Sequence, residues 1–359
     1  MLDSEAAKEA APHSPQVNEE ASEADIALER RLFDVKTVVS FGIAFLLLYL
    51  LFRNVQIDLG ATLQTIKRAD IGLYMLGFLA YYSGFLVRGW RWQRMLEDSR
   101  NGEGEDQRRG SALHLGQIIY LSWFANCLVP AKLGDLVRAY MLKRDLNVRF
   151  LKGMGTIVAE RILDLGVLLV LLSVAAVVSL RAVLPEDLSR ALEFGFALVA
   201  VALLGLLAMR KLDDLVQRLL PERFRERYAR FYEGTTRSFR SLPFVLPLTV
   251  FVWLTEAARL VFVTWALGLR ISDDPVTELL MLLFIALASA ALTALPVTPG
   301  GLGLVEALIV KAFSWGAAAS GVRITNELVW SIAILDRSIS YGSIVLLGLV
   351  VYLISRRRK

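Results

Sequence analysis

Long apolar segments dominate this chain and restrict what it can fold into. A helix needs about 20 apolar residues to cross the hydrocarbon core of a bilayer. Of all residues, 55% are hydrophobic and the mean hydropathy is +0.52, which is too apolar for an ordinary soluble domain. The sequence therefore predicts an all-α polytopic membrane protein with about six full transmembrane helices. The predicted spans are residues 37–52, 71–90, 153–180, 191–209, 243–267 and 326–354.

Two further apolar regions are interrupted by proline, glycine or charged residues. Residues 111–145 break at Pro130–Gly134, and residues 276–318 break at 295–303. A helix does not continue through such a break at full bilayer depth, because the freed backbone groups would lack hydrogen-bond partners. Each region is therefore predicted to form a re-entrant helical hairpin, which enters the membrane, turns and leaves on the same side.

The predicted elements recur in the same order in the two halves of the chain. Residues 37–180 and 191–354 each contain two spans, a hairpin and a further span, and the two halves start from opposite sides of the membrane. Arg88 lies 42 residues before Pro130, and Arg259 lies 40 residues before Pro299. These features indicate an inverted repeat, an architecture typical of secondary transporters. Local matches support it: Pro130–Ala139 aligns with Pro299–Ala307, and Ile162-Leu163-Asp164 with Ile334-Leu335-Asp336.

Basic residues set the predicted orientation. The segments assigned to the cytoplasm hold 27 of the 40 Lys and Arg residues, and the outer loops hold 7. This excess favours cytoplasmic termini in a bacterial inner membrane. Residues 1–36 are polar and are predicted to be a disordered cytoplasmic tail, and 355–359 form a basic cytoplasmic tail. Residues 210–242 are basic and amphipathic, and are predicted to lie on the cytoplasmic leaflet.

Many charged residues fall at predicted membrane depth. Each would cost about 2.5–3.5 kcal/mol or more if it faced lipid, so they are expected to pair or to face a wet cavity. One hypothesis is a polar pathway with basic sites for an anionic headgroup, and the alternative is structural pairing between helices. We expect Arg138 and Glu306 to point into a central cavity and to pair when it is empty. The candidate substrate-binding residues are Arg88, Lys132, Asp135, Arg138, Glu160, Arg161, Asp164, Glu256, Arg259, Pro299, Gly300, Gly301, Gly303, Glu306, Asp336 and Arg337.

Other site classes find little support in the sequence. Cys127 is the single cysteine, and His13 and His114 are the only histidines, so no metal site or cofactor is expected. No GxxxxGK[ST] loop, GxSxG or HExxH motif is present, and we do not expect an enzyme. Carboxylate-only chemistry within the membrane stays an open alternative. Membrane lipids are the expected partners, and nucleic acid is not.

Three motifs together resemble the lysylphosphatidylglycerol synthase transmembrane, or flippase-like, family over residues 37–354. They are Asn126 with Pro130-Ala-Lys-Leu-Gly-Asp-Leu-Val-Arg138, Glu160-Arg161-x-x-Asp164, and Pro299-Gly-Gly-Leu-Gly-x-x-Glu306. The resemblance implies movement of lipids or lipid-linked molecules between leaflets. The first motif has Lys132 and Asp135 where the family pattern implies Arg and Glu. The full synthase also carries an aminoacyltransferase domain after its membrane part, so lysine transfer to lipid is not expected here.

The sequence therefore supports two hypotheses for the function. The leading hypothesis is a flippase-like transporter without its own ATPase. The alternative is an accessory membrane scaffold for an enzyme that makes an envelope lipid or glycan, with residues 210–242 as the docking surface.

Overall fold

The protein is described from a computed structural model, which covers residues 58–99, 108–128, 133–179, 186–293 and 298–357, with four isolated positions between 39 and 49. The predicted tail 1–36, most of the span 37–52 and the Pro130 and Lys132 positions lie outside the described residues. Every regular element in the described ranges is helical. In order they are α3 (Leu59–Lys67), α4 (Ile71–Asp98), α5 (Ala112–Leu128), α6 (Gly134–Leu146), α7 (Phe150–Ser179), α8 (Glu186–Lys211), α9 (Asp213–Leu219), α10 (Glu222–Arg237), α11 (Leu242–Ala266), α12 (Pro275–Thr293), the 3-10 turn η2 (Pro299–Gly301), α13 (Leu304–Ser320), α14 (Asn326–Arg337), the π-helical turn η3 (Ser338–Gly342) and α15 (Ser343–Arg357).

Local sequence signals place several helix ends. The Asp58 and Asp70 carboxylates accept hydrogen bonds from backbone N–H groups in the first turns of α3 and α4, which is the usual role of an N-cap aspartate. Asn147 and Gly321 end α6 and α13 in the left-handed conformation that these residue types tolerate best. Most of the remaining helix length is apolar, which is why these helices bury or present hydrophobic faces.

Seven helical segments of the described chain are long and apolar enough to cross a membrane. They confirm the predicted all-helical membrane class. Both arms of the second predicted hairpin, α12 and the η2–α13 segment, are among the seven. In the first hairpin α5 has 17 residues and α6 has 13, both short of the roughly 20 needed to span. The re-entrant geometry of both regions stays a prediction.

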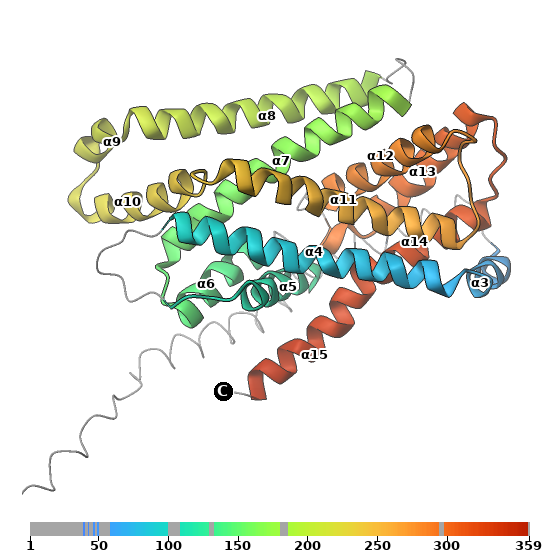
Figure 1. The fold of residues 1–359 in the computed structure, drawn as a ribbon, viewed down its shortest axis with the longest axis horizontal. Coiled ribbons are helices and arrows are strands. Elements are labelled where there is room, and N and C mark those ends of the chain that lie inside the picture. Colours follow the sequence, from blue (N-terminus) through green and yellow to red (C-terminus); the bar gives the residue numbers. More distant parts are fainter. Residues whose placement is uncertain are drawn as a thin grey trace, which may run out of the picture.

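Helices α4 and α11 form the central pair of the fold. They lie side by side and run in opposite directions (Figure 1). Their backbones approach closely, because a Cβ atom added at Gly77 would lie 3.2 Å from the Arg259 carbonyl oxygen. The remaining helices pack around this pair, with α5 and α7 against α4 and with α12 and α14 against α11. Inward-facing side chains of α4 and α11 therefore lie around the same interior space.

The segment 210–242 folds as two helices, and α10 packs along α7. The contact is tight: a Cβ atom at Gly234 would lie 2.2 Å from the Lys152 carbonyl oxygen, and one at Gly155 would lie 2.5 Å from that of Phe231. Glu233 is buried against Lys152 at 3.6 Å. One face of α10 is therefore occupied by protein. An apolar row from α9 to the start of α10 is exposed, at Leu212, Leu215, Leu219 and Phe224.

The end of α5 and the turn η2, which lies in the second predicted break, meet inside the fold. A Cβ atom at Gly300 would lie 3.6 Å from the Cys127 sulfur near the end of α5. The Tyr341 hydroxyl of η3 donates to the Cys127 carbonyl oxygen at 3.3 Å. The end of α5, η2 and η3 thus converge at one place. A π-helical turn between two apolar helices is often found at functional sites.

Candidate functional site

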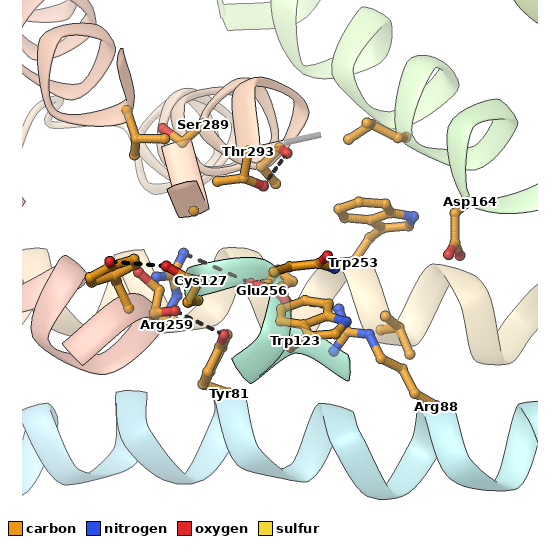
Figure 2. Close-up of a pocket in the computed structure, with 18 of the residues that line it drawn as sticks. Tyr81, Arg88, Trp123, Cys127, Asp164, Trp253, Glu256, Arg259, Ser289 and Thr293 are labelled. Carbon is orange, nitrogen blue, oxygen red and sulfur yellow. Dashed lines mark hydrogen bonds and ion pairs between the residues drawn. The ribbon is translucent and has the colours of Figure 1, made fainter. Parts of the chain in front are cut away.

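An interior cavity of about 360 Å³ lies where these helices converge. Figure 2 shows its wall, with Tyr81 and Arg88 on α4, Trp123 and Cys127 on α5, and Trp253, Glu256 and Arg259 on α11. Helices α7, α12, α13 and α14 and the turns η2 and η3 complete the wall. The candidate site residues that line the cavity are Arg88, Glu160, Arg161, Asp164, Glu256, Arg259, Gly300, Asp336 and Arg337.

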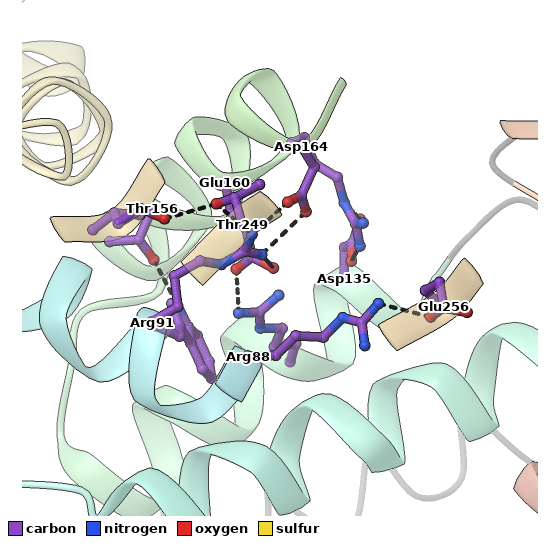
Figure 3. Close-up of polar contacts among 12 residues, drawn as sticks. Arg88, Arg91, Asp135, Thr156, Glu160, Asp164, Thr249 and Glu256 are labelled. Atoms are coloured by element: carbon purple, nitrogen blue, oxygen red, sulfur yellow. Dashed lines mark hydrogen bonds and ion pairs between the residues drawn. The ribbon is translucent and has the colours of Figure 1, made fainter. Parts of the chain in front are cut away.

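The first ion-pair cluster joins α4, α6 and α7 (Figure 3). Arg91 is fully buried and reaches Glu160 at 2.9 Å and Asp164 at 2.5 Å. It also donates to the Thr249 hydroxyl of α11 at 2.9 Å. The second oxygen of Glu160 accepts from Arg138 of α6 at 2.5 Å. Glu160 and Asp164 share one helix face, four residues apart, which lets a single guanidinium bridge both.

The second cluster joins α4, α11 and α14. Arg88 reaches Glu256 at 2.8 Å, and the other oxygen of Glu256 lies 3.8 Å from Arg259. Arg259 also reaches Asp336 of α14 at 3.0 Å. All four side chains are buried. Glu256 and Arg259 lie three residues apart on one face of α11, and Arg88 and Asp336 extend this pair into a chain of four charges.

The third cluster fixes the break of the second predicted hairpin. Arg337 reaches Glu306 at 2.9 Å and donates to the Gly300 carbonyl oxygen at 2.7 Å. Glu306 accepts from the Gly303 backbone N–H at 2.7 Å, which caps α13. Gly300 has φ +56°, and a Cβ atom there would lie 2.6 Å from the Tyr341 ring. Only glycine fits this position without strain.

Some candidate residues lie away from the cavity wall. Asp135 pairs with Arg161 at 2.7 Å, on the α6 side of α7. Arg138 and Glu306 are buried but do not line the cavity. Their expected pairing with each other is wrong, because Arg138 bonds Glu160 and Glu306 bonds Arg337. Each returning helix packs on the span that follows it, so the charge partners come from that neighbour.

The charges of the three clusters and of the Asp135–Arg161 pair balance. The six arginines are Arg88, Arg91, Arg138, Arg161, Arg259 and Arg337, and the six acids are Asp135, Glu160, Asp164, Glu256, Glu306 and Asp336. These side chains carry no surplus of positive charge that would by itself draw an anionic headgroup. In the described parts of the chain, no group of three or more His, Cys, Asp or Glu side chains is arranged to hold a metal ion.

Sequence reasoning missed several residues of this site. Arg91 is not among the candidate site residues, yet it is the most buried arginine of the first cluster. Its spacing of three residues from Arg88 was an available signal, because it places both on one helix face. The cavity residues Tyr81, Trp123, Trp253, Ser289, Thr298 and Tyr341 carried no comparable signal, since aromatic and hydroxyl side chains are common in membrane helices.

Comparison with known proteins identifies relatives but no solved structure. The family model described as the lysylphosphatidylglycerol synthase TM region matches residues 37–348. A UPF0104 membrane protein of Methanocaldococcus jannaschii is 30% identical over 239 residues, which is 65% of this chain and 95% of that protein. A UPF0104 membrane protein of Pyrococcus horikoshii is 24% identical over 353 residues, 89% of this chain and 97% of that protein. No solved structure matches the chain.

A further relative carries an enzyme name. The glycosyltransferase AglD of Haloferax volcanii is 26% identical over 305 residues, which is 75% of this chain and 47% of AglD. The matched part is therefore about half of that protein. From the family match and the apolar helices together, the chain is a multi-pass membrane protein of the lysylphosphatidylglycerol synthase TM (UPF0104) family.

Proposed function

We propose that this protein moves the polar headgroup of a lipid or lipid-linked molecule between membrane leaflets through the interior cavity. The observation that carries the proposal is a cavity of about 360 Å³ lined by charged side chains within helices long enough to cross a membrane. Liquid water takes up about 30 Å³ per molecule, so the space corresponds to roughly 12 waters. That volume suits a headgroup, while acyl chains would stay in the bilayer.

Ion pairs that can exchange partners support this proposal. Arg88 and Arg259 share the Glu256 carboxylate, so a ligand that takes one guanidinium leaves Glu256 paired with the other. A ligand could therefore enter without leaving a buried charge uncompensated, which would cost several kcal/mol. Purely structural pairing has no need of an open cavity beside the charges.

The same contacts support an inverted repeat. Arg91 pairs with Asp164, as Arg259 pairs with Asp336. Arg88 and Glu256 lie three residues before these arginines and pair with each other across the α4–α11 contact. Arg91, rather than Arg88, is then the counterpart of Arg259. With the distribution of basic residues, the repeat favours both termini on the cytoplasmic side, which in a bacterium is the inner membrane.

Leaflet exchange in proteoliposomes tests the proposal. The purified protein is reconstituted with trace fluorescent lipids, and dithionite bleaches the label in the outer leaflet. We expect the protein to raise the bleached fraction well above the roughly one half seen without it for at least one lipid of a panel of phospholipids and lipid-linked glycans. Arg259→Gln should reduce the rate, and Arg94→Gln on the exposed end of α4 should not. No exchange of any panel lipid by folded protein would refute the proposal.

The match to AglD favours one second candidate, an accessory role beside an enzyme of lipid or glycan synthesis. In that case the buried charges would be structural and the exposed row on α9 and α10 would dock the enzyme. Co-purification of one stoichiometric glycosyltransferase that is lost when Leu215 and Leu219 are changed to Ser, with no exchange in proteoliposomes, would favour this role.

A further inference from the structure

Six buried polar atoms that belong to cavity-lining residues have no hydrogen-bond partner among the described residues. Three are N–H groups that can only donate, two are hydroxyls that can donate or accept, and one is a carboxylate oxygen that only accepts. Buried polar groups normally have partners, and each unsatisfied one is costly. The atoms are Arg88 Nη1, Arg259 Nε, Trp253 Nε1, Ser289 Oγ, Thr298 Oγ1 and Asp336 Oδ1.

This set of open donors and acceptors restricts the ligand. An oxyanion such as phosphate would satisfy the N–H groups but would face the Asp336 carboxylate with like charge. It would also add a negative charge to clusters of ion pairs whose charges already balance. Hydroxyl groups accept from the N–H groups and donate to Asp336, and they leave the charge balance unchanged. The open positions therefore fit a hydroxyl-rich, uncharged group.

Aromatic side chains supply the second observation. Tyr81, Trp123, Trp253 and Tyr341 lie in the same wall as the charged residues. The Trp123 ring has the Arg88 guanidinium 4.7 Å from its centroid, which holds that cation in place. Figure 2 shows Trp253 between the charged cluster of α11 and Asp164 of α7. An aromatic ring beside carboxylates suits a sugar ring, which has an apolar C–H face and hydroxyls at its edge.

From these observations we propose that the cavity binds an uncharged sugar unit, carried as the headgroup of a glycolipid. The proposal deepens the proposed function and rests on it for the lipid anchor. The cavity lies among membrane-crossing helices, so a sugar attached to a lipid reaches it from the bilayer. The sugar hydroxyls would bond Trp253 Nε1, Arg88 Nη1 and Asp336 Oδ1.

Native mass spectrometry of the delipidated full chain tests this binding directly. The probes are glucosyl-diacylglycerol, phosphatidylglycerol with the same acyl chains, and free methyl glucoside. We expect the glucolipid to bind more tightly than phosphatidylglycerol and the free glucoside not to bind at the same concentration. Tighter binding of phosphatidylglycerol would overturn the sugar assignment, and equal binding of the free glucoside would overturn the lipid-linked one.

Two variants and a control sharpen the test. Trp253→Phe keeps a ring but removes one N–H, and should weaken the glucolipid roughly 2- to 10-fold and phosphatidylglycerol by less. Trp90→Phe, on the exposed surface of α4, should change neither. Asp336→Asn leaves one surplus positive charge and should shift the preference toward phosphatidylglycerol by roughly 10-fold. If Trp253→Phe weakens both lipids equally or neither, the proposal fails.

The two experiments distinguish failure of the transport proposal from failure of the sugar-site proposal. Glucolipid binding that depends on Trp253, without leaflet exchange, would reject transport and keep the sugar site. Leaflet exchange of every lipid at the same rate, with no sugar-dependent binding, would keep transport and reject the sugar site.

Discussion

Replacing Arg91 by Met should strongly destabilise the protein. The Arg91 side chain is fully buried and holds Glu160 and Asp164 together. After the change Glu160 keeps Arg138, whereas Asp164 has no other hydrogen-bond partner among the described residues. Removing one partner of a buried ion pair typically costs about 3–5 kcal/mol. At roughly 2 °C per kcal/mol, Tm should fall by about 6–10 °C.

Far-ultraviolet circular dichroism on heating in detergent provides the assay, because every regular element in the described ranges is helical. Arg94→Met is the matched control: it lies one turn away on α4, its side chain is 47% exposed, and its carboxylate partners are 3.7 Å away. Exposed pairs of this kind contribute about 0–1 kcal/mol, so its Tm should change little.

A double variant separates lost charge compensation from lost packing. Arg91→Met with Asp164→Leu removes both members of the pair and leaves Glu160 with Arg138. It should be more stable than Arg91→Met alone, because no buried carboxylate is left unpaired. Equal Tm values for Arg91→Met and Arg94→Met, or a double variant less stable than the single one, would refute the reasoning.

Three other predictions concern packing, transport and topology. Gly234→Ala should lower Tm by several degrees, because its Cβ would lie 2.2 Å from the Lys152 carbonyl oxygen. Gly205→Ala is the control and should not lower Tm, since its Cβ would have nothing within 4 Å. Similar Tm values for the two variants would contradict the α7–α10 packing. The Arg138→Ala variant should insert into the membrane normally but lose leaflet exchange, because Glu160 then changes its pairing beside the cavity. Wild-type exchange at normal expression would assign Arg138 to structure alone. Reporter fusions after 359 and within 210–242 should give cytoplasmic signals, and a periplasmic signal at either site would overturn the predicted orientation.

Hydropathy predicted the membrane class and most helix positions, because long apolar runs leave few alternatives. The predicted span 153–180 corresponds to α7, and 243–267 corresponds to α11. Charged residues at predicted membrane depth also indicated Asp164 and Asp336 as site residues, because a carboxylate that faces lipid costs too much free energy. These inferences rest on local composition, which a single sequence carries directly.

Partner choice could not be predicted from the sequence. Arg91 sits among arginines and tryptophans that are typical of a membrane interface, and only the packing of α7 against α4 shows it to be buried. Arg138 and Glu306 hold comparable places in the predicted repeat, yet each pairs with the span that follows its own predicted hairpin. Ser289 and Thr298 could satisfy their own backbone in a helix or turn, so nothing in the sequence marked them as cavity residues.

Blocking the cavity covalently tests most directly whether headgroups pass through it. Cys127 lies in the cavity wall, so a bulky methanethiosulfonate reagent attached to it would fill the space beside Gly300. Leaflet exchange is measured in proteoliposomes before and after modification, with labelling verified by mass spectrometry and Cys127→Ser as the unreactive control. We predict that labelled wild-type protein loses at least about nine-tenths of its exchange rate while the Ser variant keeps its rate. Fully labelled protein that exchanges lipid at the unmodified rate would contradict a pathway through this cavity.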